Sequence, residues 1–201
     1  MASAFARASA AAAVLSLGLC AQVIEFESNG LKYQTITKRG VTVMFARLPG
    51  HVREFSILQV AVSNGSAGPY TIRPEDFSYR KDDGGEVQAS HAKDVVEMLK
   101  DKGGRGDVIK LVSAYETALY GIPHMRLANA YEARRQAALA EVASTKLKAA
   151  AAASAIALVQ TKLLPGESTD GAVFFEMEGK AFGPGRLIVR TNTDTFEFQA
   201  E

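Results

Sequence analysis

The chain of 201 residues has no tryptophan, one cysteine and three histidines, and its charges nearly cancel, with 23 Lys and Arg against 22 Asp and Glu. A net charge of +1 excludes the strong positive field that is typical of nucleic-acid binding. The histidines, His51, His91 and His124, are never three or four positions apart, so the paired spacing of a zinc site is missing. We therefore expect no metal, no cofactor and no nucleic acid as a partner.

The motifs of common catalytic sites are also missing. There is no Gly-x-Ser-x-Gly elbow, and the glycine-rich run at 103–106 (GGRG) lacks the spacing and the lysine of a phosphate-binding loop. Carboxylate pairs of the glycosidase kind meet in space rather than in sequence, so the sequence leaves them open. Since 47% of the residues are hydrophobic, the chain has enough apolar material for a core. We expect a folded protein that is not an enzyme.

Residues 1–21 have the layout of a secretory signal peptide. Arg7 precedes an apolar run from Ala8 to Leu19, and this run is too short to span a bilayer. We predict export to the periplasm or the extracellular space, with no transmembrane span after signal removal. A lipoprotein signal would place a small residue before its cysteine, whereas Leu19 precedes Cys20. Ordinary cleavage is therefore favoured, and a lipid anchor at Cys20 is the alternative.

Residues 22–90 have the pattern of short β-strands separated by turns. Runs rich in β-branched and aromatic residues alternate with turn sequences such as Lys38-Arg39-Gly40 and Asp82-Asp83-Gly84-Gly85. Short strands at this spacing are typical of a sandwich or a barrel. The predicted strands are Leu31–Thr37, Val41–Leu48, Arg53–Ser63, Tyr70–Arg73, Phe77–Arg80 and Glu86–Ala89.

Residues 91–164 change to the helical period. A first helix is predicted up to Lys102, and Asp107 is a suitable N-cap for a second helix over residues 108–120. Residues 124–164 contain neither glycine nor proline and are rich in good helix formers. We interpret 124–164 as one long helix that runs back along the first two as a hairpin, and a new helix starting near Ser144 is the alternative.

The alanine-rich run at 149–159 (AAAAASAIALV) lies in the returning half of this hairpin. It has about half the twenty residues that a transmembrane helix needs, and alanine favours helix over flexible linker. We expect its small side chains to allow close packing against a neighbouring helix or sheet.

The β pattern returns after Pro165-Gly166, with predicted strands Ala172–Met177, Arg186–Arg190 and Thr195–Gln199. Strands on both sides of about seventy helical residues indicate one domain that carries an insertion. We predict a mainly β fold of about seven or eight strands, a β-sandwich formed by 22–90 and 165–201. An α-helical hairpin, residues 91–164, interrupts it.

Two stretches resemble the immunoglobulin-like β-sandwich domains of secreted bacterial proteins. They are Val60–Ser66 (VAVSNGS), continued by Pro74, Phe77 and the turn Asp82–Gly85, and Leu164–Ser168 (LPGES), followed by Gly171, Val173 and Phe174. The resemblance covers residues 31–89 and 164–200, and it implies an immunoglobulin-like sandwich that serves in envelope or surface binding. The helical block has no counterpart in that family, and the chain lacks the cysteine pair and tryptophan of antibody domains.

Two short motifs are candidate sites, but both have a simpler interpretation. Residues 105–107 (RGD) match an integrin-recognition tripeptide, but we favour the simpler interpretation, a glycine-rich break followed by a helix N-cap aspartate. Asp82, Asp83 and Glu86 offer oxygen ligands for calcium, which takes six or more. A hairpin turn requires the same residues, and we favour the turn.

Aromatic and apolar side chains give two further candidates. Tyr33, Tyr70 and Tyr79 could form a sugar-binding surface, although tyrosines on strands more often pack in the core. The turn of the predicted hairpin carries Tyr120, Ile122, His124 and Met125, which would form an exposed patch and a partner contact at an outward tip. A tip that folds back onto the strands is equally open.

These observations predict an exported, non-catalytic interaction or envelope-structural module. In this interpretation the β-sandwich is the scaffold, the helical arm is the contact surface, and the partner is another protein or a second copy of the chain. The alternative is a secreted carbohydrate- or ligand-binding accessory domain.

Overall fold

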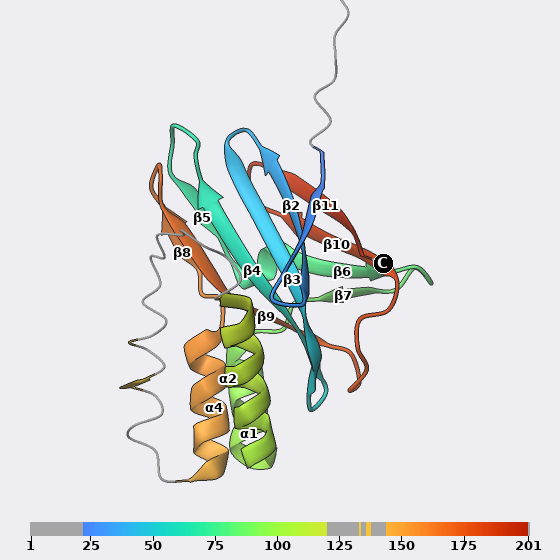
Figure 1. Ribbon diagram of the computed structural model, residues 1–201, viewed down its shortest axis with the longest axis vertical. Helices are drawn as coiled ribbons and strands as arrows, with labels where there is room; N and C mark the ends of the chain where they lie inside the picture. The colour runs from blue at the N-terminus through green and yellow to red at the C-terminus, as the bar shows by residue number, and fades with distance from the viewer. Residues whose placement is uncertain (1–21, 120–132, 134–135, 138–143, 201) are drawn as a thin grey trace, which may run out of the picture.

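The computed structural model describes residues 22–119, 133, 136–137 and 144–200, and this part of the chain is mainly β, with antiparallel strands (Figure 1). The strands are β1 (Ile24–Ser28), β2 (Leu31–Lys38), β3 (Val41–Val52), β4 (Phe55–Asn64), β5 (Tyr70–Ile72), β6 (Phe77–Lys81), β7 (Glu86–Gln88), β8 (Thr161–Leu163), β9 (Ser168–Glu176), β10 (Gly185–Arg190) and β11 (Thr195–Ala200). The helices are α1 (Ala92–Lys102), α2 (Arg105–Leu119) and α4 (Thr145–Ile156), with a short 3₁₀ turn η1 (Pro74–Asp76).

The larger sheet has the strand order β1-β2-β3-β4-β9. Its first four strands are neighbours in the order in which they occur along the chain. Two-residue turns join β1 to β2 and β2 to β3. Both turns, Asn29-Gly30 and Arg39-Gly40, have positive φ at each residue, which matches the right-handed twist of the strands that they join. The turn predicted at Lys38-Arg39-Gly40 is therefore confirmed.

A second sheet has the order β11-β10-β6-β7, and β5 pairs with β8 in a two-stranded sheet. The prediction of about seven or eight strands is too low, since the described residues contain eleven. The sequence pattern misses β1 and β8, because short strands at an edge depend on pairing with a neighbour rather than on their own periodicity.

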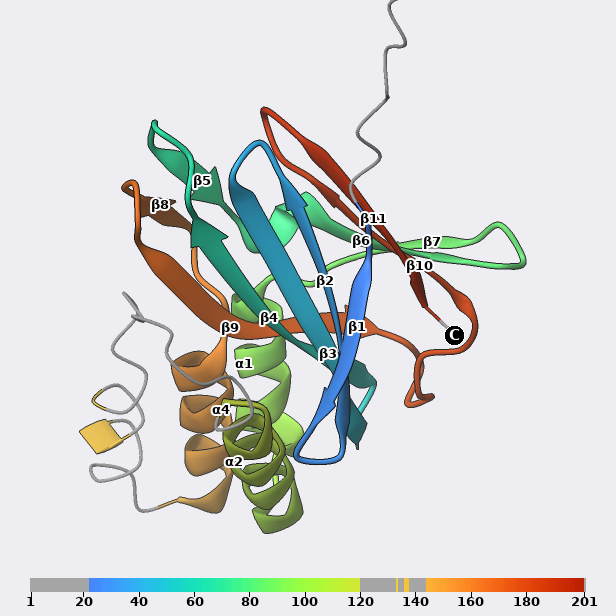
Figure 2. The ribbon, with the colours of Figure 1, turned by 45° about the horizontal axis from the view of Figure 1, so that its top comes forward.

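Two apolar cores lie on opposite faces of the five-stranded sheet. On one face, side chains such as Val43, Val60 and Phe175 pack against Leu187 and Phe198 of the second sheet. The other face is covered by the helices, whose buried side chains are described below. Figure 2 shows the helices on one side of the sheet and the second sheet on the other.

The helices form a packed layer rather than a projecting arm. Val95 and Leu99 of α1, Leu111 of α2 and the alanines of α4 form one buried cluster with side chains of the sheet, among them Tyr33, Ile57 and Phe174. The cluster continues the core across the sheet face. The helical segment is thus part of the core of this fold.

The interpretation of 124–164 as one long helix is wrong within the described residues. Ser144 is the N-cap of α4 with extended backbone, and the helix ends at Ile156. After it the chain runs beside β9, where the Leu158 N–H donates to the Ala172 carbonyl at 2.8 Å, and residues 161–163 form β8. The extended chain here is stabilised by pairing with β9 and β5, which outweighs the helical propensity of the sequence.

The alanine run packs against the chain's own surface. Six side chains of α4, from Ala149 to Ile156, are buried. A Cβ placed on Gly103 would lie 3.0 Å from the Ala149 Cβ, so α1 and α4 approach as closely as small residues permit. The prediction of close packing by small side chains is confirmed.

No helix among the described residues is long and apolar enough to cross a membrane.

Candidate functional site

A groove of about 660 Å³ lies beside β1, and we call it the β1 groove. Its lining comes from Glu25–Glu27 of β1, Leu31–Gln34 of β2 and the stretch of β3 from Phe45 to Gly50, interrupted at Ala46. Ala181 and Phe182, between β9 and β10, line its other side. A volume of this size falls in the range of small-molecule and short-peptide sites.

Strand pairing places the polar residues of the groove on one face of the sheet. Glu25 pairs with Gln34, and Gln34 pairs with Phe45 of the core between the two sheets. Directly paired residues point to the same face, so these three side chains share the face that the second sheet covers elsewhere.

Three charged side chains continue this row. They are Glu27, Lys32 and Arg47, which lie two positions along their strands from Glu25, Gln34 and Phe45 respectively. Residues two apart on a strand point to the same face. Glu27 and Lys32 are exposed, and they also pair directly across β1 and β2. The face that is apolar in the middle of the sheet is therefore charged at this corner.

Gln34 connects the row to the second sheet. Its Nε2 donates to Glu25 Oε1 and, at 2.7 Å, to the carbonyl of Gln199 in β11. Its Oε1 is buried and has no hydrogen-bond partner among the described residues. Since a buried acceptor usually has a partner, this oxygen is an unsatisfied polar atom within the row.

One aromatic ring lies beside the charged row, and a second pair lies on the opposite face of the sheet. Phe182, which lines the groove, packs against Tyr79 with ring centroids 4.9 Å apart. Phe26 stacks on Tyr33 at 5.1 Å on the helical side of the sheet. Burial raises the pKa of Tyr33 and of Tyr79, and the nearby positive charge of Arg47 opposes the rise at Tyr79. The groove thus combines the rings of Phe45 and Phe182 with acidic and basic groups.

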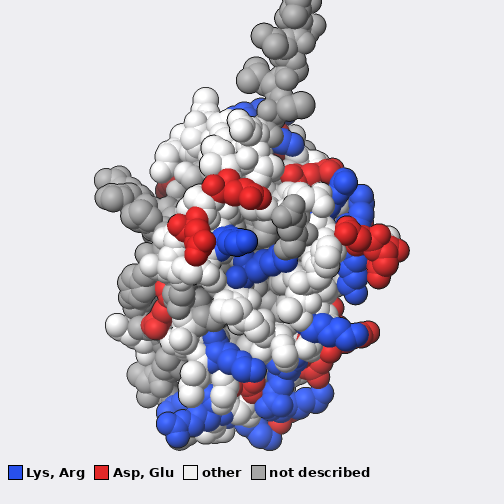
Figure 3. All heavy atoms as spheres, turned by 45° about the vertical axis from the view of Figure 1, so that its right-hand side comes forward, with Lys and Arg blue, Asp and Glu red and all other residues white. Residues whose placement is uncertain are grey.

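Acidic and basic side chains lie close to one another on the side of the molecule shown in Figure 3. No field of a single sign covers this side. The charges on this side therefore produce no bulk potential of one sign that would steer a ligand.

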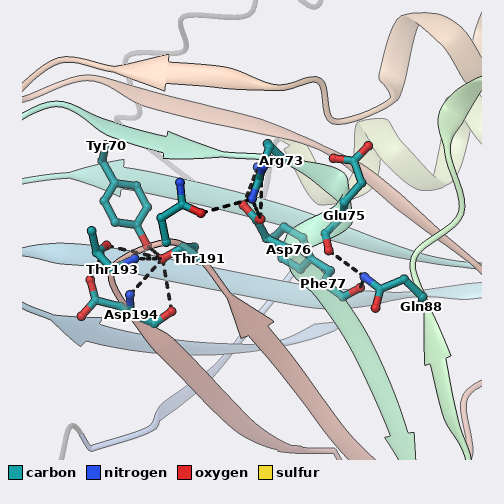
Figure 4. A network of polar contacts seen from close by, with 10 residues as sticks. Tyr70, Arg73, Glu75, Asp76, Phe77, Gln88, Thr191, Thr193 and Asp194 are labelled. Carbon is teal, nitrogen blue, oxygen red and sulfur yellow. Dashed lines mark hydrogen bonds and ion pairs between the residues drawn. The ribbon is translucent and has the colours of Figure 1, made fainter.

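A second polar feature joins η1 to the turn between β10 and β11 (Figure 4). The Tyr70 hydroxyl lies 2.8 Å from Thr191 Oγ1, and Arg73 donates to Asp76 Oδ1 at 2.8 and 3.1 Å. Arg73 also reaches Asn192 Oδ1 at 3.5 Å. These groups satisfy one another, so the network stabilises the fold and offers no site of its own.

The RGD tripeptide at 105–107 forms the first turn of α2. Asp107 is buried, accepts the Gly104 N–H at 2.8 Å, and forms a salt bridge with Arg53 Nη2 at 2.8 Å. The helix begins at Arg105, so Asp107 is its third residue and not its N-cap as predicted. From this position the Asp107 carboxylate accepts the free N–H of Gly104, which precedes the helix. A buried, paired Asp107 is unsuited to present its carboxylate to a metal in a partner.

The carboxylates at 82–86 form the predicted hairpin turn between β6 and β7. Asp83 Oδ1 accepts the Gly85 N–H at 2.8 Å, and Glu86 forms salt bridges with Arg80 and Arg190 at 3.1 and 2.9 Å. The predicted turn is confirmed. Among the described residues no three His, Cys, Asp or Glu side chains gather as a metal site would require.

The three tyrosines proposed as a sugar platform are buried. Tyr33, Tyr70 and Tyr79 are at most 6% exposed, so the sugar-platform interpretation is wrong and the packing interpretation holds. Of the histidines, His91 Nδ1 lies 3.0 Å from Glu75 Oε1 at the surface. The predicted signal peptide, Cys20 and the contact residues Tyr120, Ile122, His124 and Met125 lie outside the described residues.

The sequence contains a signal for the β1 groove that the strand assignment overlooks. In β3 the alternation Val41, Val43, Phe45 continues into Arg47, and in β2 it runs back from Ile36 through Gln34 to a lysine at 32. Charged residues in phase with a core face mark the point where that face is no longer covered.

The comparisons with known proteins leave the resemblance stated above as a prediction. No family model, no curated protein and no solved structure matches the chain.

Proposed function

We propose that the protein is an exported, non-catalytic binding module that holds a protein partner in the β1 groove. The observation that supports this proposal is the charged row, which lines the groove on a sheet face that is otherwise apolar. Glu27 and Lys32 of this row are exposed, so a partner of complementary charge can reach them. Export rests on the predicted signal peptide at residues 1–21.

We also propose that the two larger sheets form a β-sandwich that serves as the scaffold. The apolar core shared by the two sheets supports this part. The strand order β1-β2-β3-β4 follows the chain, whereas immunoglobulin domains have non-consecutive neighbours in the order A-B-E-D. Immunoglobulin-like connectivity therefore stays a prediction without support from the strand order.

The helical segment is predicted from the sequence to be the contact surface, and the proposal moves that role to the groove. Val95 and Leu99 of α1 and Leu111 of α2 are fully buried in the cluster that the helices form with the sheet. Removal of residues 91–163 would therefore expose the sheet face that the helices cover. A deletion of the helices would test folding rather than binding. A contact through Tyr120, Ile122, His124 or Met125, or a homo-oligomer, stays a prediction.

Site-specific photo-crosslinking tests the proposed function. A photoreactive residue replaces Lys32 in the groove of the full chain, and the matched control replaces Lys93 of α1, which is exposed on the helical layer. After irradiation in the native host, we expect a protein adduct at position 32 and none at position 93. Equal adducts at both positions, or none at position 32, would refute the groove as the binding site.

A small ligand in the same groove is the second candidate, favoured by the volume of about 660 Å³. It corresponds to the predicted ligand-binding accessory domain, without the tyrosine platform. A thermal-shift screen with a glycan and metabolite panel, repeated on Gln34→Ala, tests it. A shift that the variant loses would support a small ligand over a protein partner.

A further inference from the structure

We propose that the partner binds as an extended segment that adds to the open edge of β1, with basic residues beside Glu25 and Glu27 and apolar residues beside Ile24 and Phe26. This inference rests on the proposed function of the β1 groove, and it specifies the chemistry of what the groove binds. Addition of a strand to an exposed sheet edge is a common mode of peptide recognition.

The outer edge of β1 is open. β1 is the terminal strand of its sheet and pairs with β2 alone among the described residues. No backbone hydrogen bond from elsewhere in the described chain reaches residues 24–28. An unpaired edge of this kind is a template for another strand.

The hairpin geometry identifies which backbone groups face outward. Ser28 and Leu31 close the two-residue turn, and the pair that closes such a turn exchanges backbone hydrogen bonds. Because hydrogen-bonded pairs alternate along an antiparallel ladder, Phe26 also bonds to β2. The N–H and C=O groups of Glu25 and Glu27 consequently point away from β2, toward an incoming strand.

The side chains of β1 define what that strand should carry. Glu25 and Glu27 point to the groove face, while Ile24 and Phe26 lie on the opposite face and are 58% and 40% exposed. Directly opposite residues of neighbouring strands interact, and opposite charges are favourable there. An incoming segment that alternates basic and apolar residues would match both faces at once.

A second copy of β1 fits this edge poorly. Two β1 strands paired antiparallel through their outer edges would place the carboxylates of Glu25 and Glu27 beside those of the partner. Like charges at opposed positions are destabilising. The edge therefore disfavours its own strand and favours a basic segment of another protein.

Peptide binding to the full chain tests the proposal. The probe is a seven-residue peptide that alternates lysine and valine, with blocked ends, measured by fluorescence anisotropy. Its controls are the same peptide with glutamate for lysine, and a peptide of the same composition with the lysines and valines in two blocks. We expect the alternating lysine peptide to bind at least tenfold more tightly than either control.

Three variants locate the binding. Glu25→Lys combined with Glu27→Lys should weaken the lysine peptide at least tenfold and should bind the glutamate peptide instead. Glu27→Pro removes one outward N–H without removing a bond to β2, and it should also weaken binding at least tenfold. Glu97→Lys on α1, an exposed position, is the matched control and should bind like the wild-type chain.

The outcomes separate this inference from the proposed function. If the lysine peptide fails to bind while the adduct at position 32 persists, strand addition is wrong and the groove remains the site. Loss of both overturns both. Concentration-dependent dimerisation that Glu27→Pro abolishes would assign the edge to a second copy and overturn the inference. Circular dichroism of each variant confirms that a lost signal does not come from unfolding.

Discussion

Gly171 lies where the chain after α4 meets β9, and its replacement by alanine tests how closely the two approach. A Cβ at position 171 would lie 2.4 Å from Leu158 Cα and 2.5 Å from Leu158 N, whereas ordinary contacts begin near 3.4 Å. The chain at Leu158 would have to withdraw by about 1 Å, which breaks its 2.8 Å hydrogen bond to Ala172. An unsatisfied buried N–H costs about 1–3 kcal/mol, and overpacking costs a similar amount, about 1–3 kcal/mol. We expect Gly171→Ala to lower the free energy of unfolding by about 2–6 kcal/mol, the sum of these two ranges.

Urea unfolding followed by circular dichroism measures this loss. The matched control is Gly183→Ala, because no atom lies within 4 Å of a Cβ at that position and its φ is not positive. We expect the control to change stability by no more than about 0.5 kcal/mol. A loss below about 1 kcal/mol for Gly171→Ala would show that the segment after α4 does not press on β9, and the reasoning above would fail.

Three further changes test other contacts. Asp107→Ala removes both the salt bridge and the hydrogen bond to the helix N-terminus, and we expect a loss of about 2–3 kcal/mol in urea unfolding, with a smaller loss for Asp107→Asn. Ala153→Leu overfills the buried cluster that α4 forms with its neighbours and should destabilise by about 1–3 kcal/mol or more, whereas Ser154→Leu on the exposed side of the same helix should change stability by no more than about 0.5 kcal/mol. Hydrogen bonds, first of all from Arg190, hold the pKa of Glu86 at about 2. Since this pKa lies below the unfolded value of 4.5, the stabilisation by Glu86 is full above pH 4.5 and is lost as the pH falls to about 2. The groups are partly exposed, so the effect should stay near 1 kcal/mol or less. A carboxyl titration by NMR gives the pKa, and comparison with Glu86→Gln across this pH range gives the stability.

The strands of the two larger sheets are largely predictable from the sequence, because period and turn chemistry agree there. Arg39-Gly40 and the acidic turn before Glu86 fix their hairpins locally, with no help from the rest of the chain. In these regions each local preference is consistent with the final fold.

The end of α4 and the strand β8 were beyond sequence reasoning for a physical reason. Residues 157–163 contain no glycine or proline that would stop a helix, and the chain leaves the helix there because β9 and β5 supply pairing partners. A partner that is remote in sequence leaves no local trace. Helical propensity, which is a weak preference, yields to such tertiary contacts.

The β1 groove illustrates a different limit. Within β2 and β3 the alternation already puts Lys32 and Arg47 in phase with core residues, but β1 taken alone carries no such signal. Only the register, which pairs Glu25 with Gln34 and Gln34 with Phe45, shows that Glu25 lies on the same face. The pattern of single strands therefore predicts part of the row, and the pairing of the strands is needed for the rest.

The pairing of β4 with β9 has a consequence for how the chain folds. Phe55 pairs with Glu176, more than a hundred residues later, and α1, α2 and α4 lie between them in sequence. Strands β1 to β4 can assemble from local contacts, but closing so long a loop is slow and entropically costly. Until the final third of the chain is present, β4 is an open edge with an apolar face on either side, so synthesis and folding pass through a stage that invites aggregation.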